Sequence, residues 1–383
     1  MHNRLFISAS IFPYLISSFF GLFHFVSGGV VFFKEDWVVN HEDQLFIWSV
    51  LFFGFQFIII LLTFFFHKLI RPPILSLCSD KCTRNWNFNL LVGATVYFLV
   101  SMLLQLDMAY FLVGFFGKLR AFSGIITLVS IYYIFNKNKT IFIFIGLIYS
   151  LVVFIDSSSR GGLTLFVFSY IAVLLLDKKI MLSWSKLAVF CVACMILYSG
   201  FQFLESWMNA GVFEFWRFAF PFEPIVFEAT ARAIDVFNTS LFADTASLEF
   251  FCSFLPGIKS YFGCTSLQPF MQNVLFPQAG EGIGVPMNSS IEVIFLLNKS
   301  VVSLFLYYLL FIFFIFTALS LRAEGLFNVI IFLIFISHGY KLNRSGLQDV
   351  YYKILYDLSA VFLLFIIFYV FYSILYLGRR RNA

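Results

Sequence analysis

Residues 205–224 read ESWMNAGVFEFWRFAFPFEP, and residues 280–292 read GEGIGVPMNSSIE. These two pieces lie in residues 205–300, the longest part of the chain without a clear membrane-spanning run. This part contains arginines, lysines, several carboxylates and a glycine-rich turn, whereas long apolar runs lie on both sides of it. Functional residues are often carried by such connecting segments on a rigid scaffold. We therefore expect the chemistry of the protein in this segment or beside it.

The composition of the chain predicts its class. Of the 383 residues, 61% are apolar, only 12% are charged and 58 are Phe, whereas a soluble domain carries about 25% charged residues. Apolar runs recur along the whole length, and about 20 apolar residues suffice to cross a bilayer as a helix. We expect an all-α polytopic membrane protein, one membrane domain over residues 1–383, with about ten transmembrane helices (between about 8 and 12).

The charge distribution orients this expected membrane domain. With both termini placed in the cytoplasm, the cytoplasmic segments are shorter in total than the outer segments. They nevertheless hold more than half of the 25 Lys and Arg residues, as the positive-inside rule predicts. A large loop at 205–300, carrying short amphipathic helices, and a second loop at 341–357 then lie outside. The chain shows no internal repeat, which argues against transporter folds built from repeats. The expected spans used below are 44–66, 140–155, 161–176, 301–321, 326–340 and 358–377.

Arg160 is the first candidate functional residue. It lies between two apolar runs of about sixteen residues, each about 24 Å long as a helix and shorter than a hydrocarbon core of about 30 Å. An ionisable group at that depth is a candidate for function. The alternative is an interfacial Arg that pairs with Asp156.

Arg217 and Arg232 are candidates in the long segment. Arg217 lies in the aromatic stretch FEFWRFAF, and the alternatives for it are phosphate binding and anchoring of the loop. Arg232 lies in a predicted amphipathic helix at 224–243. It can present its charge to a headgroup, or it can form an i,i+4 ion pair with Glu228.

Glu292 and His338 are the candidate proton acceptors. Glu292 follows Ser289 at the spacing of a capping box, so it is either a helix cap or a general base where the loop meets the membrane. His338 lies near the outer end of the run at 326–340 and is either a base near neutral pH or a structural residue. Arg344 follows in the next polar segment. No acidic pair of the kind that holds a metal–nucleotide complex is found, which argues against a sugar-nucleotide donor and a divalent metal.

The chain resembles bacterial O-antigen polymerases of the Wzy type, within the wider group of O-antigen polymerase and ligase membrane glycosyltransferases. The resemblance rests on the Phe-rich layout, the Ser159-Arg160-Gly161-Gly162 turn between two short runs, the large outer segment with arginines, and the Gly-rich stretch that leads to Glu292. It implies a location in the bacterial inner membrane and a role in lipopolysaccharide biosynthesis.

The reaction implied is polymerisation of lipid-linked O-antigen repeat units. The growing glycan passes from undecaprenyl pyrophosphate to the terminal sugar of a new lipid-linked repeat unit, without metal or cofactor. The implied partners are the undecaprenyl-pyrophosphate-linked oligosaccharide and a chain-length regulator in the membrane, with no nucleic acid. Alternatives are a flippase or transporter of the same lipid-linked oligosaccharide, and an O-antigen ligase. The expected roles are pyrophosphate or glycan binding by Arg160, Arg217, Arg232 and Arg344, with Glu292 or His338 as the base.

Overall fold

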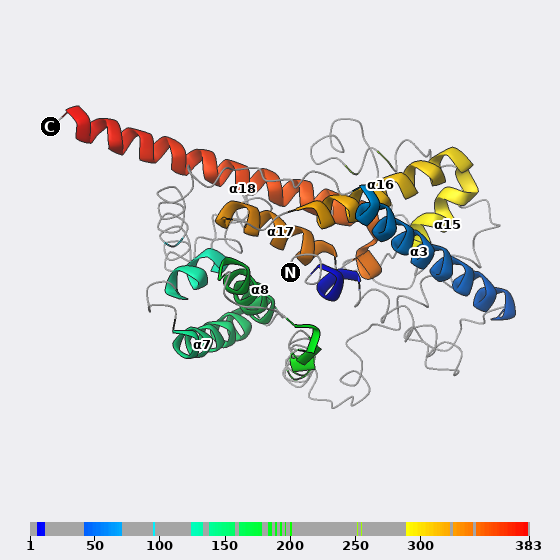
Figure 1. Cartoon of the computed structure of the whole chain (residues 1–383), viewed down its shortest axis with the longest axis horizontal. Helices are drawn as coiled ribbons and strands as arrows, with labels where there is room; N and C mark the ends of the chain where they lie inside the picture. Colours follow the sequence, from blue (N-terminus) through cyan, green and yellow to red (C-terminus); the bar gives the residue numbers. More distant parts are fainter. Residues whose placement is uncertain are drawn as a thin grey trace.

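Regular structure in the computed structural model is helical. The described residues are 6–11, 42–70, 95, 124–132, 138–157, 161–177, 289–321, 325–339 and 342–381, with scattered positions between 183 and 200 and at 251 and 254. Figure 1 shows the elements in chain order: η1 (Ile7–Ile11), α3 (Glu42–Ile70), α7 (Lys139–Ser157), α8 (Gly161–Leu176), α15 (Ser289–Lys299), α16 (Val301–Ser320), α17 (Leu326–Gly339) and α18 (Leu342–Arg381).

The number of transmembrane helices expected from the sequence is wrong. Among the described residues, one helix, Val301–Ser320 with a mean hydropathy of 2.5, is long and apolar enough to cross a membrane, against about ten expected. An apolar run indicates burial in apolar surroundings, and a protein interior provides these as well as lipid does. A helix of 14 residues, such as α17, is also only about 21 Å long. The shorter apolar helices are Gly54–Ile70, Lys139–Leu151, Leu165–Leu176 and Leu326–Gly339.

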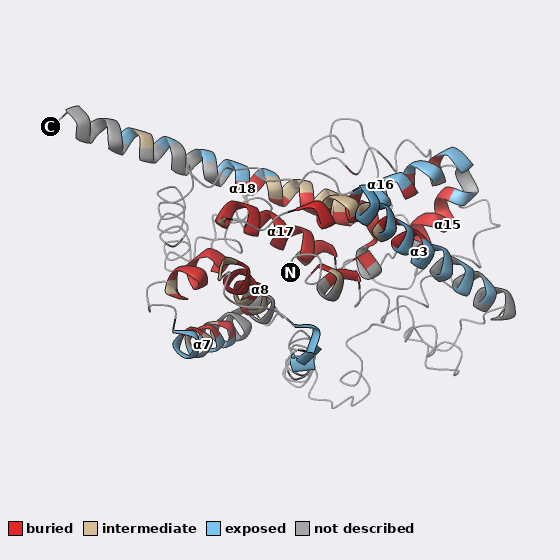
Figure 2. Ribbon diagram, in the orientation of Figure 1, coloured by how far each residue is buried: buried red, intermediate tan, exposed pale blue. Residues whose placement is uncertain are grey.

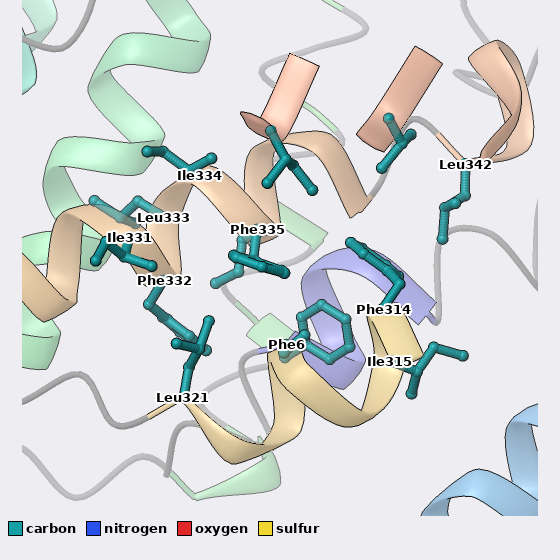
Figure 3. Close-up of a cluster of buried hydrophobic side chains, with 14 of the residues drawn as sticks. Phe6, Phe314, Ile315, Leu321, Ile331, Phe332, Leu333, Ile334, Phe335 and Leu342 are labelled. Atoms are coloured by element: carbon teal, nitrogen blue, oxygen red, sulfur yellow. The ribbon is translucent and has the colours of Figure 1, made fainter. Parts of the chain in front are cut away.

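Helix α17 forms the centre of the described core. All its residues except Ser337 are buried, and it packs against α18, α8 and η1 (Figure 2). The rings of Phe314 and Phe335 stack with centroids 5.8 Å apart, and Phe6 lies 6.2 Å from Phe314 (Figure 3). A helix that is apolar on all sides lies either in a protein core or in a membrane, and here neighbouring helices cover it. This packing fixes the position of His338 in the last turn of α17.

Helices α7 and α8 pack closely side by side. A Cβ at Gly146 would lie 2.8 Å from two ring carbons of Phe166, so the absence of a side chain lets the two helices approach. Residues 158–160 between them, including Arg160, lie outside the described residues. The structure therefore describes α7 and α8, the two helices that flank Arg160, but not Arg160 itself.

Substitution Gly146→Ala is expected to destabilise the protein by about 1–3 kcal/mol, because the new methyl group meets the Phe166 ring in a packed interface. The measurement is the free energy of unfolding in denaturant. Gly54→Ala in α3 is the matched control: nothing lies within 4 Å of its Cβ position, so we expect no loss or a gain of about 0.5–1 kcal/mol from helix propensity. Combining Gly146→Ala with Phe166→Leu is expected to recover part of the loss; equal effects at Gly146 and Gly54 would contradict this packing.

Helix α18 differs from the sequence expectation in its first half. Most of residues 341–357, expected as a polar loop, are helical and continue into the run expected at 358–377. Gly346, with φ 73° and ψ 172°, interrupts the helix near its start. The first part packs against α15 and α17, and the C-terminal part extends away from the other helices (Figure 1). Of the expected long loop at 205–300, the structure describes mainly its end, which is α15.

Candidate functional site

The Glu292 carboxylate joins three helices. Glu292 lies in the first turn of α15 and is only 1% exposed. Its Oε2 accepts hydrogen bonds from the Tyr307 hydroxyl of α16, at 2.8 Å, and from the backbone N–H of Leu347, at 2.6 Å. Its Oε1 accepts one from the backbone N–H of Gln348, at 2.9 Å. The last two donors belong to α18, so this one side chain connects α15 and α16 to the start of the straight part of α18.

The break at Gly346 explains why α18 needs this carboxylate. The first N–H groups of a helix have no partner within it, and a negative charge is favourable at a helix N-terminus. Leu347 and Gln348 are the first residues after the break, and Glu292 supplies the acceptor from another helix. A Cβ at Gly346 would lie 2.5 Å from Oε1 of Glu292, so only glycine allows this approach. Glu292 is therefore a cap, but these bonds cap α18 and not α15, for which the sequence spacing predicted it.

Burial raises the pKa of Glu292 to about 7. Removal from water is the largest cause, because it penalises the charged carboxylate. The hydrogen bonds from Gln348, Tyr307 and Leu347 act in the opposite direction, and the charge of Asp349 adds a smaller upward shift. The carboxyl group therefore changes its protonation state near neutral pH.

The stability of the protein is expected to fall as pH rises from about 4.5 to about 7. The folded state holds the Glu292 proton in this window whereas the unfolded state releases it, and the difference amounts to at most about 3 kcal/mol. The measurement is the denaturant midpoint of wild type and Glu292→Gln between pH 4 and 8. Because the variant cannot titrate at this position, its stability relative to wild type is expected to increase with pH across the window. A constant difference between the two proteins would contradict the raised pKa.

The second polar site is a buried pair, His338 and Asp357. Nε2 of His338, in the last turn of α17, lies 2.5 Å from Oδ2 of Asp357 on α18, and the side chains are 7% and 4% exposed. The donor and acceptor roles depend on the tautomer of the ring: with Asp357 ionised, Oδ2 accepts from Nε2–H and Nδ1 carries the lone pair. A carboxylate that holds one imidazole tautomer prepares the other nitrogen to accept a proton.

Asp357 is the residue that the sequence reasoning missed. It is the last residue of the expected loop at 341–357, and no sequence pattern assigns it a role. The available signal was weak: a carboxylate directly before an apolar run, 19 residues after the candidate base. The structure gives it a partner because α17 and α18 pack against each other.

Two of the predicted site residues, Glu292 and His338, contact α18, and others lie outside the described residues. The contacts of Glu292 and His338 on this helix, at Leu347 and Asp357, are ten residues or about 15 Å apart, so they form two separate sites. Arg344 lies on the same helix before the break, but only its backbone is described. Arg160, Arg217 and Arg232 lie outside the described residues.

Two further polar contacts belong to this region. The Tyr351 hydroxyl of α18 donates to the backbone carbonyl of Leu310 in α16, at 2.6 Å. Lys353 and Asp349 form an i,i+4 ion pair on α18. Over the part of the chain that the structure describes, no group of three or more His, Cys, Asp or Glu is arranged to hold a metal ion.

Comparison with known proteins adds no relative. The chain matches no protein-family model, and it shows no significant similarity to a curated protein or to a solved structure.

Proposed function

We propose that this protein is a membrane glycosyltransferase that polymerises lipid-linked O-antigen repeat units, with His338 as the general base. The observation that carries the proposal is the buried His338–Asp357 pair at the end of α17. The hydroxyl oxygen of the acceptor sugar attacks the anomeric carbon of the donor glycan, and the bond from that carbon to the pyrophosphate oxygen breaks. The hydroxyl proton passes to the imidazole of His338. The products are undecaprenyl pyrophosphate and a glycan longer by one repeat unit.

The chemistry of this transfer suits an imidazole base. A sugar hydroxyl becomes a better nucleophile when a positioned group takes its proton, and a base that titrates near neutral pH does so efficiently. Of the two base candidates, Glu292 already accepts three hydrogen bonds, two of them from α18, whereas the contact of His338 with Asp357 orients an imidazole for proton transfer. We therefore assign the base to His338 and not to Glu292.

The leaving group requires positive charge. Departing pyrophosphate carries two or more negative charges, and arginine stabilises phosphate oxygens through paired, charge-assisted hydrogen bonds. Arg344 follows His338 by six residues and lies near the start of α18, before the break at Gly346. We propose Arg344, Arg160, Arg217 and Arg232 as the pyrophosphate and glycan ligands.

The exposed apolar residues of two helices support a location at a membrane. Helices α3 and α16 pack against each other, and both carry many exposed residues (Figure 2). Large apolar side chains are among them, including Phe65 at 60% and Phe305 at 62% exposed. Exposed apolar side chains, where they gather into a large patch, mark contact with lipid or with another protein. The proposed location is the bacterial inner membrane, with the lipid-linked substrates in the same bilayer.

The test is a lipopolysaccharide gel from a strain in which this gene is deleted and then restored on a plasmid. We expect the ladder to collapse to core plus one repeat unit, because units are still exported and ligated but no longer joined, and to return on complementation. If no repeat unit reaches the core, the protein acts in export or ligation. That result would replace the polymerase proposal by a flippase or a ligase.

A further inference from the structure

One residue from each of three neighbouring helices makes polar contact with α18. Near its break, Glu292 of α15 accepts from Leu347 and Gln348. One turn further, Tyr351 donates to the Leu310 carbonyl of α16. Three turns from the break, Asp357 meets His338 of α17. The catalytic pair thus lies at one end of a helical stretch whose other end is held by Glu292.

We infer that Glu292 is a positioning residue that fixes the start of this α18 stretch and thereby sets the contact between Asp357 and His338. The effect on glycan transfer rests on the proposed function, whereas the effect on the geometry of α18 does not. Nothing in the sequence spacing connects Glu292 to Asp357. The connection exists only because α15, α16 and α17 all pack around the same part of the chain.

The break at Gly346 makes an acceptor from outside the helix necessary. Because the dihedral angles of Gly346 are not helical, the amides of Leu347 and Gln348 begin a new helical segment and need partners other than the preceding turn. Both amides are buried with Glu292, and a buried N–H that loses its acceptor carries the full penalty of lost hydration. The carboxylate therefore stabilises the start of this segment.

The stiffness of a helix transmits this constraint. From Leu347 to Asp357 the segment runs about 15 Å without a further break, so a tilt at its start displaces its far end. A hydrogen bond weakens steeply when its donor and acceptor lose alignment, so such a displacement would weaken the contact between His338 and Asp357. Glu292 consequently acts on the base through α18 and without touching it.

The first measurement is amide hydrogen exchange in the full-length protein, comparing wild type, Glu292→Gln and Tyr307→Phe. Gln keeps the size of the side chain but offers one oxygen and no charge, so we expect Leu347 and Gln348 to exchange about 10- to 100-fold faster. Tyr307→Phe is the matched control. It removes one bond from the same carboxylate and leaves both α18 bonds, so exchange at these two amides is expected to stay near wild type.

The second measurement is the NMR signal of the proton shared by His338 Nε2 and Asp357 Oδ2. The chain has five histidines, so the signal is assigned by its loss in His338→Gln. We expect it at low field in wild type and in Tyr307→Phe, and moved upfield or broadened in Glu292→Gln. A residue that serves only overall folding would leave this signal unchanged in the folded protein.

The outcomes separate the two proposals. If Glu292→Gln leaves the amides and the His338 proton unchanged while transfer is lost, Glu292 takes part in the chemistry itself and the inference is overturned. If wild type shows no transfer activity, the proposed function fails, and the exchange and NMR measurements still decide on positioning. Where Glu292→Gln does not fold, Glu292→Asp, which withdraws the carboxylate by one methylene group, carries the same expectations and the same consequences.

Discussion

Replacement of His338 by Gln is expected to reduce glycan extension by about 10²- to 10⁴-fold, the usual contribution of a general base. The Gln side chain keeps a donor that can reach Asp357, so the buried carboxylate retains a partner and the fold is expected to persist. The measurement is the initial rate of chain extension on lipid-linked repeat units, together with the lipopolysaccharide ladder. The ladder is expected to shorten to core plus one repeat unit.

Ser337→Ala is the control for this substitution. Ser337 is the neighbouring, half-buried residue, and its hydroxyl donates within its own helix to the Ile334 carbonyl at 2.9 Å. Its loss is expected to leave extension within about twofold of wild type, because local Ser back-bonding contributes little to a helix. A full-length ladder from His338→Gln would remove His338 from the mechanism and leave the base unassigned.

Substitution Gly346→Ala is expected to have the largest effect on stability, about 2–6 kcal/mol. A side chain at φ 73° and ψ 172° costs about 1–3 kcal/mol in backbone strain. The new methyl group would in addition lie 2.5 Å from the Glu292 carboxylate, and such overpacking costs about 1–3 kcal/mol. The measurement is the free energy of unfolding at pH 7, with expression level as a secondary readout.

Gly325→Ala separates the two contributions. Gly325 also has a positive φ, 80°, but nothing lies within 4 Å of its Cβ position, so only backbone strain is expected there. The difference between the two variants measures the clash with Glu292. Glu292→Asp in the Gly346→Ala background is expected to recover part of that difference, since the shorter side chain makes room. Equal losses at both glycines, with no recovery, would show that the carboxylate does not press on Gly346.

The sequence predicted several helices close to their observed limits. The run at 44–66 lies within α3, the runs at 140–155 and 161–176 correspond to α7 and α8, and the run at 301–321 corresponds to α16. These predictions succeed because an apolar run bounded by polar residues is a local property. An apolar run does not show whether lipid or protein surrounds the helix. Nearly all of α17 is buried within the protein, although its sequence resembles a membrane span.

In the candidate site, too, the residue types were local information, whereas their contacts depended on the packing of helices. Glu292 and His338 stood out in the sequence as ionisable groups beside apolar runs, and their identities alone made them candidates. Their partners did not: Leu347 lies 55 residues from Glu292, and Asp357 lies 19 residues from His338. No local pattern predicts a contact that depends on how α15, α17 and α18 pack together.

By itself, the sequence determined the helical class, the positions of most described helices and the identities of the two candidate bases, because each depends on neighbouring residues along the chain. Only the tertiary structure decided that Glu292 caps α18 with a pKa near 7 and that Asp357 holds His338. Burial and hydrogen-bond geometry are properties of packed segments, and packing brings together residues that the chain keeps far apart.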